Sequence, residues 1–319
     1  MVSSENGRNE FVNSVIDLIQ QYGFDFIDLD WEFPVRGFPQ MGVKGNPDDA
    51  DYMLQLLKQF SQQFQSQLKF NCFITIALPS PEYYLSQYDI NSIDPYIEYY
   101  NAMTYDFSGT FSATANFASN LYTNGTGLAV DESIKRMIKA GIPSDKLLMG
   151  IPAYATTFRD CKENKFPTTY NKDSTLKIGE NGYIPINKVD WSKVDQQWND
   201  ELKANYGYFK DYNMLLSYDS IKSVTEKVNY IKDNKLKGVM VWALHQDFPV
   251  SDQRSLVSNS VNLLGQDNLE NSQNNINYPN SKFENVKDSN FKVTVTSNSL
   301  ILFSSNLFTY IFLVVLIFN

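Results

Sequence analysis

Residues Tyr22–Pro34 read YGFDFIDLDWEFP. Aromatic and β-branched residues fill this short run, which glycine and proline bound, as is typical of a buried strand. Four acids interrupt the apolar pattern. Because side chains alternate along a strand, Asp28, Asp30 and Glu32 are predicted to project from one face, successive members about 6–7 Å apart, with Asp25 on the other.

Carboxylates buried without partners cost several kcal/mol each, so a strand that only fills a core would not carry three of them. Stacked acids repel one another, and we expect one of them to stay protonated near neutral pH. A protonated carboxyl at the end of a buried strand suits general acid catalysis. The alternative is a metal-binding or solvated acidic edge strand, which Trp31 and the flanking hydrophobic residues disfavour.

The stretch resembles the signature D-G-x-D-x-D-x-E of glycoside hydrolase family 18, the chitinases and chitinase-like proteins. Asp25, Asp28, Asp30 and Glu32 match its acids position for position. The family usually has glycine where this chain has Phe26, whose ring is predicted to sit low in the barrel interior on the face of the acids. The resemblance implies the α/β class and a (β/α)8 TIM barrel whose fourth strand this is.

Three further stretches resemble family motifs in the same order. The strand ending in Met103, Tyr105 and Asp106 resembles M-x-Y-D, and LLMGIPAY at 147–154 resembles G-x-P-x-Y-G-R up to its tyrosine. The arginine of that motif is missing, and Arg159 is a candidate substitute. The last strand, 236–244, ends near a tryptophan that the family places under the distorted sugar. The resemblance thus implies five substrate-binding residues: Met103, Tyr105, Asp106, Tyr154 and Trp242.

By resemblance the substrate is chitin or another β-1,4-linked N-acetylglucosamine oligosaccharide, and no metal or organic cofactor is implied. The resemblance also implies three catalytic roles: Glu32 would protonate the glycosidic oxygen, Asp30 would hold the substrate's acetamido nitrogen, and Asp28 would stabilise the charge beneath it. Asp30 and Glu32 on one strand face cannot easily flank the bond as acid and nucleophile, which fits substrate assistance. The alternatives are a non-catalytic sugar-binding relative, which would typically lack Glu32, and an endo-acting N-glycan glycosidase, which commonly lacks Trp242.

The predicted helix at 9–22 corresponds to the one that follows the third barrel strand in the family. Three β/α units would then lie upstream of Met1, so we expect this chain to be a truncated gene product or an incomplete gene model. A chain whose barrel stays open is expected to be inactive. The catalytic domain is assigned to 1–265. Within it, the aromatic-rich segment 158–216 resembles by its position the small α+β insertion that forms one wall of the substrate groove in many family members. The alternative is a surface excursion.

Composition narrows the partners and the chemistry. The chain has 27 basic and 36 acidic residues in 319, a net charge of −9, which argues against nucleic acid and is compatible with a neutral sugar. One disulfide could not stabilise a chain of this length by itself, so we favour a free thiol at Cys72 over a Cys72–Cys161 disulfide. His245 is the only histidine, and it is interpreted as a satisfied loop residue.

The C-terminal part differs in character from the rest. Residues 266–298 are polar and rich in asparagine, which predicts a disordered linker, and 299–319 are almost wholly apolar. The absence of Lys or Arg after this tail favours a glycosylphosphatidylinositol signal over a transmembrane helix. The start lacks a signal peptide, so an extracellular or cell-surface location again requires a missing beginning. Asn124–Gly125–Thr126 is the only glycosylation sequon.

Overall fold

The structure is a computed structural model that describes residues 1–68, 70–125, 127–172, 182–269, 277–287 and 315–317. The chain falls into two units. The first comprises Met1–Ala77, Ser86–Tyr99 and Leu269–Asn319, and the second comprises Leu78–Leu85 and Tyr100–Asn268. Each unit is described by itself.

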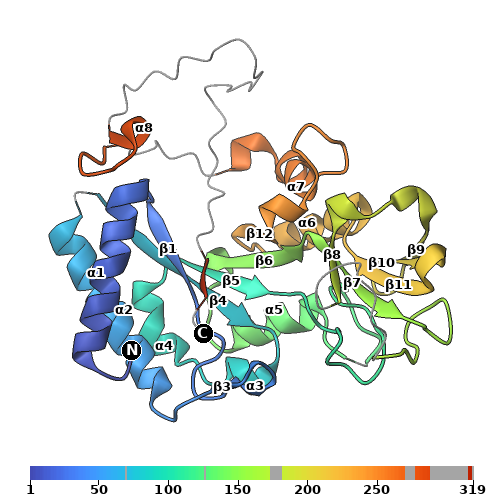
Figure 1. The fold of residues 1–319 in the computed structure, drawn as a ribbon, viewed down its shortest axis with the longest axis horizontal. Helices are drawn as coiled ribbons and strands as arrows, with labels where there is room; N and C mark the ends of the chain where they lie inside the picture. The colour runs from blue at the N-terminus through green and yellow to red at the C-terminus, as the bar shows by residue number, and fades with distance from the viewer. Residues whose placement is uncertain (69, 126, 173–181, 270–276, 288–314, 318–319) are drawn as a thin grey trace. The chain divides into compact units, whose positions relative to one another are not determined.

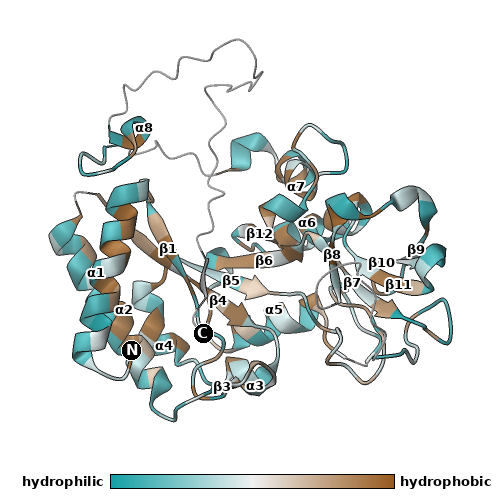
Figure 2. Cartoon of the chain, viewed as in Figure 1, coloured by the Kyte–Doolittle hydropathy of each residue, from teal (hydrophilic) through white to brown (hydrophobic). Residues whose placement is uncertain are grey.

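Two amphipathic helices lie side by side in the first unit (Figure 1). They are α1 (Glu5–Tyr22), which starts four residues earlier than predicted, and α2 (Asp49–Gln67). Their apolar sides meet where the rings of Phe11 and Phe60 pack edge to face at 5.7 Å. Hydrophilic and hydrophobic residues alternate along both helices in Figure 2, as expected for helices with one buried face. Gly23 ends α1 in the left-handed conformation, with φ 74°.

Strand β1 (Phe26–Asp30) pairs in parallel with β4 (Phe73–Pro79). The strand is shorter than predicted, because it ends at Asp30 and Glu32 lies in the loop that follows. The direction of the Glu32 side chain is therefore set by that loop and not by strand alternation. The buried residues Ile27 and Leu29 confirm the apolar face that the sequence predicts.

The bulky residue at the position of the family glycine has a partner within the same unit. Phe26 and Phe73 stand opposite each other in the register of β1 and β4, and their rings stack at 4.9 Å with an interplanar angle of 2°. Phe26 is half-buried. A cross-strand aromatic pair of this kind stabilises a sheet, so the pair explains how a large ring is accommodated here.

The remaining elements of the first unit are short. The residues after β1 form the short hairpin β2 (Gly37–Phe38) and β3 (Val43–Lys44). Strand β13 (Val315–Ile317) pairs in parallel with β1 on the side away from β4. Four further helical segments complete the unit: η1 (Pro39–Met41), α4 (Ile90–Ile93), η2 (Asp94–Tyr96) and α8 (Glu284–Lys287).

Part of the segment assigned to a polar linker packs against the first unit. Tyr278 is 4% exposed, and its hydroxyl donates to the Phe24 carbonyl at 2.9 Å and to Asp25 Oδ1 at 3.0 Å. Ser281 is also buried and donates to the Gln21 carbonyl. The ring of Tyr278 and the hydroxyl groups of Tyr278 and Ser281 thus pack part of a segment that composition alone predicts to be disordered.

The second unit holds three parallel strands in the order β5 (Tyr99–Met103), β6 (Leu147–Pro152) and β12 (Gly238–Trp242). Together with β1 and β4, the two units contain five strands of the alternating β/α order that the sequence predicts. The helices and helical turns of this unit are α3 (Glu82–Leu85), α5 (Val130–Lys139), η3 (Ser144–Lys146), α6 (Ile221–Asp233), η7 (Leu244–Gln246), α7 (Leu256–Leu264) and η8 (Gln266–Asn268).

A five-stranded antiparallel sheet lies between β6 and α6 in the sequence. Its spatial order is β8 (Tyr183–Pro185), β7 (Tyr154–Arg159), β11 (Met214–Tyr218), β10 (Ala204–Phe209) and β9 (Val194–Asn199). The sheet packs on its own hydrophobic cluster, which includes Met214 and Leu216. Three helical turns connect its strands: η4 (Ile186–Lys188), η5 (Trp191–Lys193) and η6 (Lys210–Tyr212).

Most of the C-terminal apolar segment predicted as a membrane anchor lies outside the described residues, namely 299–314 and 318–319. Among the helices that the structure does describe, none is both long enough and apolar enough to cross a bilayer.

Candidate active site

The acids of β1 meet a threonine on the neighbouring strand. Asp28 is 1% exposed and stands opposite Thr75 of β4 in the strand register. The Thr75 hydroxyl, itself buried, donates to Asp28 Oδ1. This hydrogen bond gives the deepest acid of the strand a neutral hydrogen-bond partner where solvent does not reach.

Asp30 and Glu32 share a proton-binding arrangement at the end of β1. Burial raises the pKa of Asp30 to about 8, and the charges of Glu32 and Asp28 and a hydrogen bond with Glu32 act in the same direction. Asp30 Oδ1 is buried and has no hydrogen-bond partner among the described residues. A raised pKa of this size favours a proton on the hydrogen-bonded pair at neutral pH, in the direction expected for stacked acids. The unpartnered oxygen is an acceptor available to a ligand.

A tyrosine that sequence reasoning missed lies beside this pair. Tyr88 is 8% exposed, and its hydroxyl donates to the carbonyl of Trp31 at 3.2 Å. Burial raises the pKa of Tyr88, and the charges of Asp30 and Glu32 raise it further. The contact fixes the peptide between the two acids, so Tyr88 positions the loop that carries Glu32. Its sequence context, SQYDI, offers no pattern that would have identified it.

We expect the Asp30→Asn variant to lose a pH dependence of stability. The Asp30 pKa is 3.8 when unperturbed and about 8 in the folded chain, so between these values the folded chain holds the extra proton. The free energy of unfolding therefore falls as the pH rises from about 4 to about 8. Coupling spreads this titration over Asp30 and Glu32. We therefore expect the decrease in unfolding free energy between these pH values to be smaller in the variant by on the order of 3 kcal/mol.

Urea unfolding at a series of pH values measures this slope. The matched control is Asp17→Asn, which changes an exposed aspartate on α1 of the same unit and should preserve the wild-type slope. An Asp30→Asn variant whose stability follows the wild-type pH profile would show that Asp30 does not hold the proton.

A second cluster, in the second unit, is built around Asp106. This residue follows β5 with a positive φ of 55°, and its Oδ1 accepts a hydrogen bond from the Tyr154 hydroxyl at 2.8 Å. Burial raises the pKa of Asp106 to about 6, although the hydrogen bond from Tyr154 lowers it. The ring of Tyr183, on β8, packs edge to face on Tyr154 at 5.2 Å. Asp106 and Tyr154 are thus brought together as the motifs imply, and Tyr183 is an addition.

Tyr105 belongs to the same cluster. Its ring lies 6.3 Å from that of Tyr154, edge to face, and its hydroxyl contacts Met240 Sδ at 4.0 Å. Gly150 of β6 lies directly beneath it, because a Cβ there would come within 2.7 Å of the Tyr105 ring and 2.4 Å of the Ala102 carbonyl. Only glycine fits this close approach. The glycine of the G-x-P-x-Y motif thus has a packing reason within this unit.

The other expected substrate-binding residues also lie at strand ends of the second unit. Met103 ends β5, and its carbonyl accepts a hydrogen bond from the Ser80 hydroxyl at 2.7 Å. Trp242 ends β12 and is half-buried. Its carbonyl accepts from the Ala153 amide at 2.7 Å, which ties the end of β12 to the end of β6. Arg159, the candidate substitute for the missing arginine, ends β7 opposite Met214.

The cysteines and the histidine of the chain lie apart from the two acidic clusters in their chemistry. Both cysteines are free thiols, and burial raises the pKa of Cys161 to about 11. His245 is exposed, and its carbonyl accepts from Asn187 Nδ2 at 3.0 Å, which agrees with a loop role. Across the described parts of the chain, no group of three His, Cys, Asp or Glu side chains has a geometry that could hold a metal ion.

Comparison with known proteins identifies a family. The family model for glycosyl hydrolases family 18 matches residues 1–247. The chain is 28% identical to Endochitinase 1 of Metarhizium robertsii over 88% of its own length and 64% of that protein. It is 32% identical to Probable chitinase 10 of Drosophila melanogaster over 77% of its length and 11% of that protein. The Group IV chitinase of Ostrinia furnacalis superposes with a TM-score of 0.73 at 25% identity, covering 83% of this chain and 75% of that one.

Proposed function

Because this chain belongs to family 18 of the glycosyl hydrolases, we propose that it hydrolyses β-1,4-linked N-acetylglucosamine polymers with retention of configuration. It is a chitinase-like member of that family, with named chitinases among its relatives. Since the chain spans less than two thirds of the first of these relatives, the activity and substrate are proposals. The observation that carries them is the buried acidic pair Asp30 and Glu32 at the end of β1, in which burial and the charge of Glu32 raise the pKa of Asp30 to about 8.

In the proposed first step, Glu32 gives a proton to the glycosidic oxygen as the bond from that oxygen to the anomeric carbon breaks. The carbonyl oxygen of the substrate's own acetamido group forms a bond to the same carbon, so no protein nucleophile is needed. Asp30 holds the acetamido N–H, for which its unpartnered Oδ1 is a suitable acceptor. Asp28 stabilises the positive charge that develops on the acetamido group.

In the second step a water molecule gives a proton to Glu32 and its oxygen bonds to the anomeric carbon. The bond to the acetamido oxygen breaks, and a sugar of retained configuration leaves. Glu32 is then protonated again for the next cycle. A shared proton between Asp30 and Glu32 suits this exchange, because the pair can pass the proton internally between the steps.

We further propose that the Asp106 cluster of the second unit binds N-acetylglucosamine units of the substrate. Tyr105 would contact the acetamido group, Asp106 a ring hydroxyl, and Trp242 the apolar face of the sugar. Asp106, Tyr105 and Tyr183 are half-buried, and their carboxyl and phenol groups are the donors and acceptors that sugar recognition requires. Residues 158–216, which include most of the antiparallel sheet, are proposed as the wall of the substrate groove.

We further propose an extracellular location for the protein and a membrane anchor at 299–319, which residues 266–298 join to a catalytic domain at 1–265. Treatment of cells with a phospholipase specific for glycosylphosphatidylinositol tests both, because only a lipid-anchored surface protein is released.

The test of the proposed reaction uses two matched substrates. We expect the chain to hydrolyse the hexamer of N-acetylglucosamine and to leave the hexamer of glucosamine uncut, because the latter lacks the attacking acetamido oxygen. Proton NMR of the first product should show the β-anomer. Binding of the acetylated hexamer without turnover would favour the non-catalytic alternative, and cleavage of both hexamers would contradict substrate assistance.

A further inference from the structure

The loop that follows β5 carries Asp106 near its start and closes on itself before the chain reaches α5. The Phe107 amide donates to the Ala118 carbonyl at 3.0 Å, so the residue next to Asp106 is bound to the far side of the loop. Asp106 has a positive φ of 55°, a conformation that a residue other than glycine keeps only where its surroundings hold it. The position of Asp106 therefore depends on what holds Ala118.

Two buried groups at the end of β11 hold this side of the loop. The Ala118 amide donates to Ser217 Oγ at 2.9 Å, and the hydroxyl of the next residue, Ser119, donates to Asp219 Oδ2 at 2.8 Å. Ser119, Ser217 and Asp219 are all buried. Hydrogen bonds that water does not reach are costly to break, because each broken bond leaves a buried polar group without a partner. The loop is therefore tied to the antiparallel sheet at two consecutive residues.

A buried cation compensates the charge of Asp219. Lys227 of α6 is fully buried, and its Nζ lies 2.8 Å from Asp219 Oδ2. A hydroxyl binds a charged carboxylate more strongly than it binds a neutral acceptor. Ser223 of α6 donates to Asp219 Oδ1 at 2.6 Å, whereas Ser119 donates to Oδ2. The helix and the loop thus each bind Asp219 through one serine hydroxyl.

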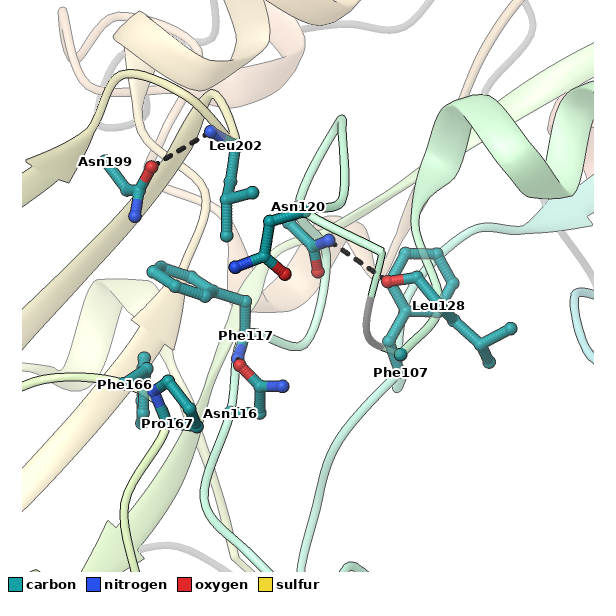
Figure 3. A pocket seen from close by; sticks show the side chains of 11 residues that line it. Phe107, Asn116, Phe117, Asn120, Leu128, Phe166, Pro167, Asn199 and Leu202 are labelled. Carbon is teal, nitrogen blue, oxygen red and sulfur yellow. Dashed lines mark hydrogen bonds between the residues drawn. The ribbon is translucent and has the colours of Figure 1, made fainter.

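Apolar packing alone leaves this loop room to shift. The small pocket beside it, shown in Figure 3, has a volume of about 70 Å³. Its lining includes Phe107, Phe117, Asn120, Phe166 and Leu202. Phe117 packs edge to face on Phe166 at 5.1 Å, but a void of this size leaves the side chains around it short of contacts. The buried hydrogen bonds of Ala118 and Ser119 supply the missing constraint.

We propose that Asp219 is a positioning residue for the cluster around Asp106. Through Ser119 it fixes the loop on which Asp106 meets the Tyr154 hydroxyl, which comes from β7 and donates to Asp106 Oδ1 at 2.8 Å. A loop that shifted would carry Asp106 away from this partner. The consequence for the substrate rests on the proposed function, because a sugar senses the position of Asp106 only if it binds there.

The test removes one serine hydroxyl at a time, because removal of Asp219 itself would leave Lys227 buried without its partner. Ser119→Ala breaks the tie to the loop, and the matched control Ser223→Ala breaks the tie to the helix. Calorimetric titration of the full chain with the N-acetylglucosamine hexamer should show an affinity at least about fivefold weaker in Ser119→Ala, the usual net contribution of one hydrogen bond. Ser223→Ala should bind as the wild type does, and Ser119→Thr, which restores the hydroxyl, should recover the affinity.

Hydrogen exchange of the sugar-free chain tests the loop directly. The Phe107 and Ala118 amides should exchange faster in Ser119→Ala and at the wild-type rate in Ser223→Ala. Equal exchange in the two alanine variants, or amides that stay protected in Ser119→Ala, would overturn the proposal. The Asp106→Asn variant separates this result from the proposed function. If that variant binds the hexamer as tightly as the wild type, the sugar site fails, while the exchange rates still decide whether Asp219 positions the loop.

Discussion

The Glu32→Gln variant is expected to lose turnover of N-acetylglucosamine oligomers by at least about 10²–10⁴-fold, the usual contribution of a positioned general acid. Glutamine keeps the size and the hydrogen-bonding capacity of the side chain but has no proton to give to a leaving oxygen. The Tyr88 contact that positions the loop is to the Trp31 carbonyl, so the substitution leaves it in place. Affinity for the oligomer should therefore change little.

Turnover and binding have to be measured on the same preparation. Single-turnover hydrolysis of the N-acetylglucosamine hexamer gives the rate of the chemical step, and calorimetric titration with the same hexamer gives the affinity. The matched control is Glu10→Gln, because Glu10 is an exposed glutamate on α1 that, among the described residues, accepts a hydrogen bond from Asn6 and contacts no residue of the candidate site. Turnover that survived in Glu32→Gln would remove the assigned role, and a loss in both variants would point to misfolding.

The acids at the end of β1 were predictable because their chemistry conflicts with their surroundings. A buried strand does not carry charges without a function, and Asp28, Asp30 and Glu32 stood out for that reason. The sequence could not tell where the strand ends, because strand propensity does not fix boundaries. Glu32 was predicted within the strand but lies in the loop after β1, which ends at Asp30, and its direction depends on Trp31 and the rest of the loop.

Partners supplied by distant parts of the chain were harder to predict. Thr75, Tyr88 and Tyr183 contact the candidate residues from other elements, and none of them belongs to a recognisable local pattern. Tyr278 is a clear example, since it lies in an asparagine-rich segment and yet binds Asp25, about 250 residues earlier. Composition averages over such a segment, whereas one buried ring and its hydroxyl decide whether it packs.

The Asp219→Ala variant is expected to lose about 3–5 kcal/mol of unfolding free energy, because it leaves a buried cation without its partner. Lys227 is 0% exposed, and its Nζ lies 2.8 Å from Asp219 Oδ2. Asp219 also accepts hydrogen bonds from Ser119 at 2.8 Å and Ser223 at 2.6 Å. Burial lowers the pKa of Lys227 and the charge of Asp219 raises it, so losing Asp219 favours the neutral amine.

The double variant Asp219→Ala, Lys227→Met separates the pair from the packing around it. Methionine occupies nearly the space of lysine without its charge, so the double variant should be more stable than Asp219→Ala by roughly 1–4 kcal/mol. Urea unfolding of the wild type, of Asp219→Ala, of Lys227→Met and of the double variant completes the double-mutant cycle. Because Ser119 belongs to the loop that follows Asp106, hydrogen exchange should rise in that loop in Asp219→Ala. A single variant within about 1 kcal/mol of wild type would mean that the second unit does not depend on this ion pair.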